Sequence, residues 1–170
     1  MAIEYFPIVD EEGNQIGKAS RSECHSGSFL LHPVVHLHVL NQEGKLYLQK
    51  RSETKDVQPG KWDTSVGGHV DFGESIEQAL KREVREELSI NSFEPVFIHR
   101  YQFVSEIESE LVHSYYCIYS GEIHPDPDEI SEGRFMSLKE IKQLIGKNYF
   151  TPNFETEFEI LTKQGLLPIK

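Results

Sequence analysis

Short stretches of the chain alternate apolar and polar residues, which is the pattern of half-buried β-strands. In residues 33–40, Val35, Leu37 and Val39 alternate with two histidines. Residues 1–20 predict an N-terminal β-hairpin, because a polar turn separates two apolar stretches there. Further strands are predicted over residues 46–49, 96–104, 111–123 and 134–136.

Three segments carry helix signals. Residues 75–88 place apolar side chains at helical spacing, and residues 137–145 open on a Ser-x-x-Glu capping box. Residues 151–165 begin with Thr-Pro, which puts proline at the first helical position. Residues 21–31 show no regular pattern. Strands followed by helices at the middle and end predict an α/β sandwich in a single domain over residues 1–170.

Composition limits the classes of function. The chain has 170 residues, and its 17 Lys and Arg against 28 Asp and Glu give a formal net charge of −11. That charge argues against binding nucleic acid polymers or anionic membranes. A small phosphorylated ligand remains compatible with it, since carboxylates can hold a cation that meets the phosphates. Two distant cysteines and no apolar run long enough to span a membrane lead us to expect a cytoplasmic protein.

The predicted helix over residues 75–88 carries acids on its apolar side. On a helical wheel, Glu83 and Glu87 fall inside the stripe formed by Leu80 and Val84, and Glu86 borders it. Two carboxylates four residues apart repel each other, and burying one without a partner is costly. Either a divalent cation or Lys and Arg side chains from elsewhere in the fold must therefore neutralise the charge of these carboxylates.

The residues around this helix resemble the signature of the Nudix hydrolase family. The matching residues are Gly68, Glu74, Arg82, Glu83, Val84, Glu86, Glu87 and Ile90. Ser89 stands where the family has glycine, and serine can adopt the left-handed conformation expected there at a modest cost. This departure leaves the geometry of the helix end open and does not affect the ligands. The resemblance covers a loop and helix over residues 68–90. It implies the Nudix fold, an α/β/α sandwich with a mixed sheet.

Members of this family hydrolyse a diphosphate joined to another group, by attack of water at phosphorus. The resemblance implies that Glu83 and Glu87 are the main carboxylate ligands of Mg²⁺ or Mn²⁺. Gly68 would offer its backbone carbonyl to the same metal. The expected partner is therefore a small-molecule diphosphate, and a homodimer is left open as the assembly.

Three other residues of the signature would serve the reaction. Glu86 would bind the metal through water, or would orient or deprotonate the attacking water. Glu74 and Arg82 would form an ion pair that locks the loop to the helix. The sequence supports this arrangement in part, because Arg82 and Glu86 are neighbours four residues apart on a helix.

Much of the chain also resembles the isopentenyl-diphosphate isomerase branch of the same superfamily. The resemblance runs from Leu48 to Ser75 and includes the preceding segment with His25 and His32. In the isomerase these histidines, and the one matching His69, help to bind a metal beside a catalytic cysteine. Gly67 occupies the position of that cysteine here.

The isomerase also uses carboxylates on a later strand, and an alignment around residues 112–115 finds His113 and no acid. The resemblance therefore implies that isomerisation is lost and hydrolysis is retained, as in a bacterial Nudix subgroup with an N-terminal hairpin. Isomerase activity and a catalytically silent binding module remain alternatives. The three histidines are either a second metal site, suited to Zn²⁺, Mn²⁺ or Fe²⁺, or structural residues.

Overall fold

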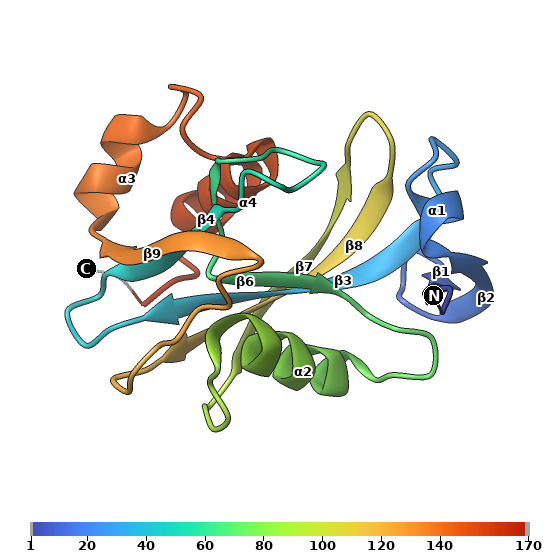
Figure 1. Ribbon diagram of the computed structural model, residues 1–170, viewed down its shortest axis with the longest axis horizontal. Coiled ribbons are helices and arrows are strands. Elements are labelled where there is room, and N and C mark those ends of the chain that lie inside the picture. Colours follow the sequence, from blue (N-terminus) through green and yellow to red (C-terminus); the bar gives the residue numbers. More distant parts are fainter. Residues whose placement is uncertain (1, 169–170) are drawn as a thin grey trace.

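The computed structural model describes residues 2–168 and shows a mixed β-sheet between two helical layers (Figure 1). Helix α2 covers one face of the sheet, and α3 and α4 lie on the opposite side. The strands are β1 (Tyr5–Val9), β2 (Gln15–Ser20), β3 (Leu31–Leu40), β4 (Leu46–Arg51), β5 (Trp62–Asp63), β6 (Val66–His69), β7 (Val96–Val104), β8 (Ser109–Ile118) and β9 (Ile130–Met136). The helices are α1 (Arg21–Cys24), α2 (Ile76–Leu88), α3 (Leu138–Leu144) and α4 (Pro152–Lys163).

The large sheet has seven strands and is mixed in direction. Its main path runs β5-β4-β3-β8-β7, with β6 pairing with β3 and β9 pairing with β4. Strands β3 and β8 are parallel, and the other pairs are antiparallel. Strands β1 and β2 form a separate hairpin. The expected α/β/α architecture with a mixed sheet and an N-terminal hairpin is confirmed.

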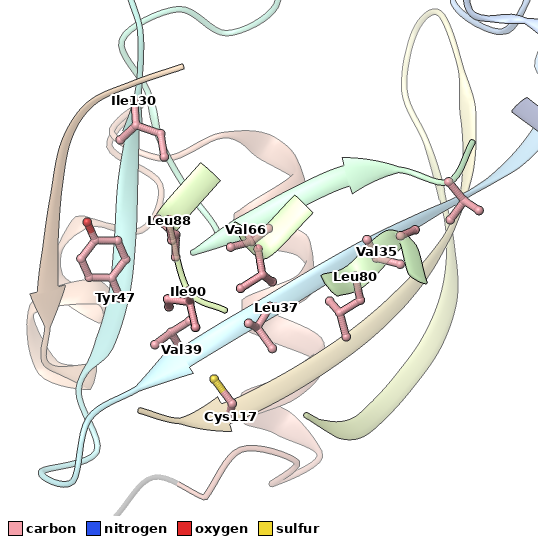
Figure 2. Packing of buried hydrophobic residues seen from close by; sticks show 13 residues of the cluster. Val35, Leu37, Val39, Tyr47, Val66, Leu80, Leu88, Ile90, Cys117 and Ile130 are labelled. Carbon is pink, nitrogen blue, oxygen red and sulfur yellow. The ribbon is translucent and has the colours of Figure 1, made fainter. Parts of the chain in front are cut away.

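The alternating pattern of β3 sends its side chains to the two faces of the sheet. Val35, Leu37 and Val39 pack with Leu80 and other apolar residues of α2 (Figure 2). The intervening histidines face α4, where a second core is built mainly from aromatic and aliphatic residues of α4 and β4. Because both faces of β3 are covered, its polar residues are buried as deeply as its apolar ones.

The largest differences from the predicted element boundaries concern three segments. The segment 21–31 has no regular pattern in the sequence, but it begins with α1, because Ser20 and Glu23 form a capping box. The strand expected over residues 111–123 instead spans Ser109–Ile118, which brings Glu110 into the sheet. Strand β9 begins four residues earlier than expected, at Ile130, where it pairs with Arg51. Within residues 2–168, no helix has the length and apolar character needed to cross a membrane.

Candidate active site

Local signals at both ends of α2 position the loop and helix over residues 68–90. The Ser75 hydroxyl accepts a hydrogen bond from the Gln78 amide (3.1 Å), and the Gln78 side chain accepts one from the Ser75 amide (2.9 Å). This capping box sets the first turn of α2. At the other end, Ser89 is left-handed (φ 58°), so serine takes the conformation in which the family has glycine. Its amide donates to the Arg85 carbonyl, which closes the helix.

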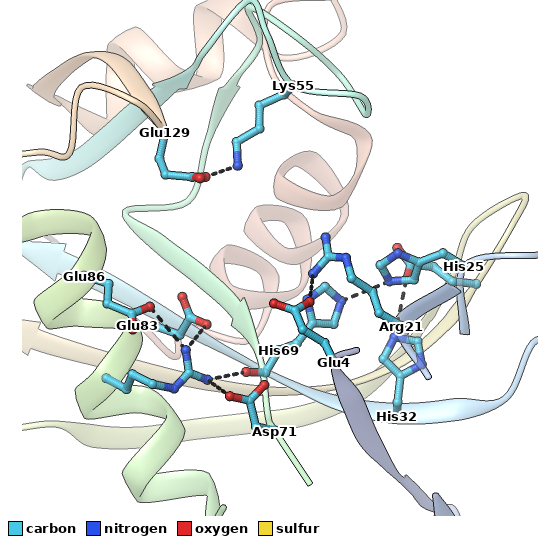
Figure 3. Close-up of polar contacts among 12 residues, drawn as sticks. Glu4, Arg21, His25, His32, Lys55, His69, Asp71, Glu83, Glu86 and Glu129 are labelled. Atoms are coloured by element: carbon cyan, nitrogen blue, oxygen red, sulfur yellow. Dashed lines mark hydrogen bonds and ion pairs between the residues drawn. The ribbon is translucent and has the colours of Figure 1, made fainter. Parts of the chain in front are cut away.

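Arg82 ties the preceding loop to the helix. Its guanidinium donates to both carboxylate oxygens of Glu74 (2.7 and 3.0 Å) and to the backbone carbonyl of His69 (3.0 Å). The same group donates to Glu83 (2.8 Å) and to the exposed Glu86 (3.3 Å). Figure 3 shows Glu83 and Glu86 gathered around these contacts. The ion pair that the resemblance implies between Glu74 and Arg82 is therefore present.

Glu83 lies against the backbone of Gly68. A Cβ atom added to Gly68 would overlap the Glu83 carboxyl group, so only glycine lets this side chain approach the loop so closely. The side chain of Glu83 is 15% exposed. Burial raises the pKa of Glu83 to about 7, against the opposing effect of Arg82. The carboxylate and the backbone of residue 68 thus come together, as the resemblance requires of two ligands to one metal.

Glu87 is partly buried one turn later, and the described residues offer it no cationic partner. Its carboxylate accepts from the Gly67 amide (3.2 Å) and from the Gln49 side chain (3.2 Å). Within residues 2–168, no Lys, Arg or His lies within ion-pair distance of it. Burial and the neighbouring Glu83 raise the pKa of Glu87 to about 8. The two explanations left open for the buried acids, ion pairing and a divalent cation, therefore apply to different residues. Arg82 pairs with Glu83, whereas no ion pair within residues 2–168 neutralises Glu87.

The three histidines from separate segments also meet (Figure 3). The Nε2 atoms of His25 and His69 are 3.2 Å apart, and those of His25 and His32 lie 2.8 and 3.3 Å from one oxygen of Glu108. One ligand atom from each of these four residues lies within 4.8 Å of the others. Glu110 borders the cluster, 4.0 Å from His69.

The hydrogen bonds around His32 show what this cluster can hold. Nδ1 of His32 lies 2.8 Å from the Leu30 carbonyl, which can only accept, so Nδ1 carries a proton. In the neutral ring, Nε2 then presents a lone pair toward the Glu108 carboxylate. Two acceptors facing each other repel unless a proton or a metal cation lies between them, and no third group of the described chain hydrogen-bonds the buried Nε2 atom of His32. Histidine held by a backbone carbonyl is also the usual arrangement around a protein-bound metal.

Residues of this cluster have pKa values that differ from their usual ones. Burial alone would raise the pKa of Glu108, but the neighbouring His25 and His32 rings hold that pKa well below its usual range. Burial and the neighbouring His32 hold the pKa of His69 well below its usual value, so its ring is neutral. Burial opposes protonation of His32, but the Glu108 carboxylate raises its pKa, so a proton can lie between the two groups in the metal-free protein. Once that proton is displaced, neutral imidazoles and an ionised carboxylate form the ligand set that transition metals prefer.

The expectation that the later strand carries no acid is wrong. Glu110 lies on β8, paired in register with His32 on β3, and Glu108 immediately precedes the strand. Both acids precede residues 112–115, where the alignment finds none. His113 is no ligand, since it lies apart from the cluster, and burial lowers its pKa to about 4. The signal that could have found the acids is their alternate spacing, Glu-x-Glu, at the start of a strand.

Sequence comparisons match most of the chain to one known domain family. The family model of the NUDIX domain matches residues 30–154. An uncharacterised Nudix hydrolase of Yersinia pestis is 35% identical over 153 residues, covering 89% of this chain and 81% of that protein. Isopentenyl-diphosphate Delta-isomerase 1 of Photorhabdus laumondii is 29% identical over 164 residues, covering 92% of this chain and 93% of that protein.

Solved structures share the fold. The crystal structure of DR0079 from Deinococcus radiodurans superposes with a TM-score of 0.79 and 22% sequence identity, covering 92% of this chain and 98% of that one. The MutT protein from Methanosarcina mazei Go1 superposes with a TM-score of 0.68 and 23% identity, covering 79% and 95% of the two chains. At these identities the likeness concerns the fold alone.

Proposed function

The chain belongs to the Nudix family and is a pyrophosphohydrolase, and we propose that it cleaves small organic diphosphates with Mg²⁺ or Mn²⁺ held by Glu83 and Glu87. The substrate is of the nucleoside-diphosphate type or another organic diphosphate. Gly68 offers its backbone carbonyl to the same metal. The one-domain organisation over residues 1–170, the cytoplasmic location and the homodimer stay predictions.

The observation that carries this proposal is the environment of Glu87. A carboxylate that is removed from water, beside a second carboxylate and without a cationic partner in the described chain, destabilises the metal-free fold. Oxygen ligands gathered from Glu83, Glu87 and a backbone carbonyl suit a hard divalent cation. The same observation argues against a silent binding module, which has no need of an uncompensated acid.

The neighbouring residues support hydrolysis by water. When bound, the cation neutralises charge on the diphosphate and makes a bound water more acidic. Glu86 is 54% exposed and is held by Arg82, so it can take the proton of the attacking water. The water oxygen adds to phosphorus, and the bond from phosphorus to the bridging oxygen breaks. Arg82 and Glu74 position the loop and the acids, and do not themselves touch the reacting atoms.

A second metal site is proposed at His25, His32, His69 and Glu108. The buried and facing acceptors of His32 and Glu108 support it, and the ligand set favours Zn²⁺, Mn²⁺ or Fe²⁺ over Mg²⁺.

One observation favours isopentenyl-diphosphate isomerisation as a second candidate function. The histidine cluster has its carboxylates after all, with Glu108 among the histidines and Glu110 beside them. Against this, Gly67 provides no side chain at the position of the isomerase cysteine. Cys24 cannot replace it, because the thiol is buried and burial raises its pKa to about 11. Hydrolysis therefore remains the favoured function.

The proposal is tested by incubating the protein with nucleoside diphosphate derivatives and isoprenyl diphosphates in the presence of Mg²⁺ or Mn²⁺. Release of phosphate or of a monophosphate supports hydrolysis. Incorporation of solvent deuterium into the allylic product of isopentenyl diphosphate indicates isomerisation. Binding without turnover of any compound contradicts both enzymatic functions.

A further inference from the structure

A fully buried carboxylate, Glu157 of α4, lies between two histidines of β3. His36 Nδ1 is 2.6 Å from one oxygen of Glu157, and His38 Nε2 is 2.9 Å from the other. The Ser114 hydroxyl donates to the same carboxylate. An ionised carboxylate only accepts hydrogen bonds, so all three neighbours donate to it. Nothing in the proposed chemistry at Glu83 and Glu87 uses this network.

The second ring nitrogen of His36 points to a different place. Strand pairing sets His36 directly opposite Gly67. A Cβ atom on Gly67 would lie 3.3 Å from Cδ2 and 3.5 Å from Nε2 of His36, and no other described side chain comes within 4 Å of that point. Gly67 is itself exposed, and Nε2 makes no hydrogen bond within residues 2–168. His36 therefore presents a free ring nitrogen to the open space above Gly67.

The network also fixes the charge of His36. Burial would lower the pKa of His36, but the Glu157 carboxylate outweighs it and raises that pKa to about 9. Glu110 and Asp63 are the other charged groups that act on the ring, and both favour the protonated form. Nε2 thus carries a proton and can donate it in a hydrogen bond.

A second unpartnered group lies on the same side of α4. Asn153 precedes Glu157 by four residues, so the two side chains share one face of the helix. The Oδ1 atom of Asn153 is buried without a hydrogen-bond partner in the described chain. An unpaired buried polar atom is costly and marks a place where a partner is missing.

The position of this space relative to β6 decides which part of a substrate reaches it. The Gly67 amide binds Glu87, on the side of β6 that faces α2, whereas His36 approaches from the side that faces α4. A diphosphate held at Glu83 and Glu87 lies on the α2 side. What extends across Gly67 to His36 is therefore the organic group attached to the diphosphate.

We propose that His36, oriented by Glu157, donates a hydrogen bond to a polar atom of the substrate's organic group, and that this contact selects polar organic groups over hydrocarbons. The inference rests on the proposed function, because it assumes a diphosphate at Glu83 and Glu87. An isoprenyl chain across Gly67 would leave the His36 nitrogen unpaired and desolvated, which is how a site built for hydrogen bonding rejects an apolar analogue. His36 is then a substrate-binding residue, and Glu157 is a positioning residue.

The test uses three non-hydrolysable probes with Mg²⁺: methylenediphosphonate alone, a set of nucleoside 5′-methylenediphosphonates, and isopentenyl methylenediphosphonate. Calorimetric titration of the wild type is expected to give the tightest binding for a nucleoside probe. His36→Gln should weaken the binding of that probe about ten-fold and leave the affinity for the other two probes unchanged, since a charged hydrogen bond is lost only with the nucleoside probe. In ¹⁵N spectra, the His36 Nε2 signal should move with the nucleoside probe and stay in place with methylenediphosphonate.

Because His36→Gln leaves a buried carboxylate with one donor fewer, a second variant avoids the network. Gly67→Ala adds a methyl group against the His36 ring, at an exposed strand position whose backbone is not left-handed. This variant should weaken the binding of the nucleoside probe and leave the binding of the other two probes unchanged. Gly17→Ala is its matched control, because the added methyl group lies 3.7 Å from the Ile8 Cβ in the remote hairpin. The control should bind all three probes as the wild type does.

Equal weakening of all probes by Gly67→Ala, or an unmoved His36 signal with every nucleoside probe, overturns this inference and leaves the proposed function standing. Tighter binding of the isopentenyl probe than of every nucleoside probe overturns it as well. Failure of all three probes to bind the wild type contradicts the proposed function and the inference together.

Discussion

Replacing Glu87 with glutamine is expected to make the metal-free protein more stable at alkaline pH while removing its Mg²⁺ response. Glu87 has a pKa of about 8 in the fold, above the ordinary value of 4.5. Its contribution to the free energy of unfolding is therefore fully present below about pH 4.5 and is lost as the pH rises through about 8. Above that range the metal-free fold carries an uncompensated negative charge at this position, and the neutral glutamine side chain would carry none.

The size of this effect on the free energy of unfolding follows from the shift in the pKa of Glu87. A rise in pKa from 4.5 to about 8 corresponds to about 5 kcal/mol of destabilisation once the Glu87 carboxyl group is ionised. Glutamine keeps one acceptor for the Gly67 amide but turns a donor toward the Gln49 side chain, which costs about 1–2 kcal/mol. The net gain expected for Glu87→Gln in chelator at about pH 9 is about 3 kcal/mol, with a small loss at about pH 4.

Urea unfolding at both pH values, in chelator and in millimolar Mg²⁺, measures this gain. Mg²⁺ should stabilise the wild type most at the higher pH, because a cation that binds only the folded state offsets the repulsion of Glu83 and Glu87. It should not stabilise Glu87→Gln. Glu86→Gln is the matched control, since its carboxylate is largely exposed and paired with Arg82, and this variant should not gain stability at about pH 9. A variant that is less stable than the wild type at about pH 9 would refute the reasoning about Glu87.

Three further outcomes are expected. Ser89→Gly should raise the free energy of unfolding by about 0.5–1 kcal/mol, because glycine adopts the left-handed conformation without strain; an unchanged urea midpoint would contradict this. His69→Ala should weaken Zn²⁺ binding roughly ten-fold or more in competition with a chelating dye, whereas the exposed His124→Ala should not; equal affinities would exclude the histidine cluster as a metal site. The wild type should incorporate no solvent deuterium into isopentenyl diphosphate by NMR, since Gly67 supplies no acid; clear incorporation would establish isomerisation.

Features that depend on local sequence were predictable. The hairpin and the capping box at Ser137 each rest on neighbouring residues. The wheel placed Glu83 and Glu87 among apolar residues of one helix, and the structure shows both partly buried there. The family signature then gave them a chemical meaning that spacing alone left open.

Features that depend on long-range register were not predictable. Glu108 and Glu110 reach the histidines only because β8 pairs in parallel with β3, and no local signal fixes that register. Glu157 falls at helical spacing on the apolar stripe of α4 with Phe154, Phe158 and Leu161, but nothing local shows which side chains meet it there. Its burial depends on His36 and His38, which come from a distant strand on the opposite side of the interface.

The most direct test of the central claim is the turnover of diphosphates by Glu83→Gln and Glu87→Gln beside the wild type. Each change keeps the shape of the side chain and removes the negative charge that holds the cation. With Mg²⁺ the wild type should release phosphate or a monophosphate from at least one organic diphosphate, and chelator should abolish this release. Each variant should lose roughly a hundred-fold or more in kcat while remaining folded. Wild-type turnover by either folded variant, or turnover that persists in chelator, would contradict the account.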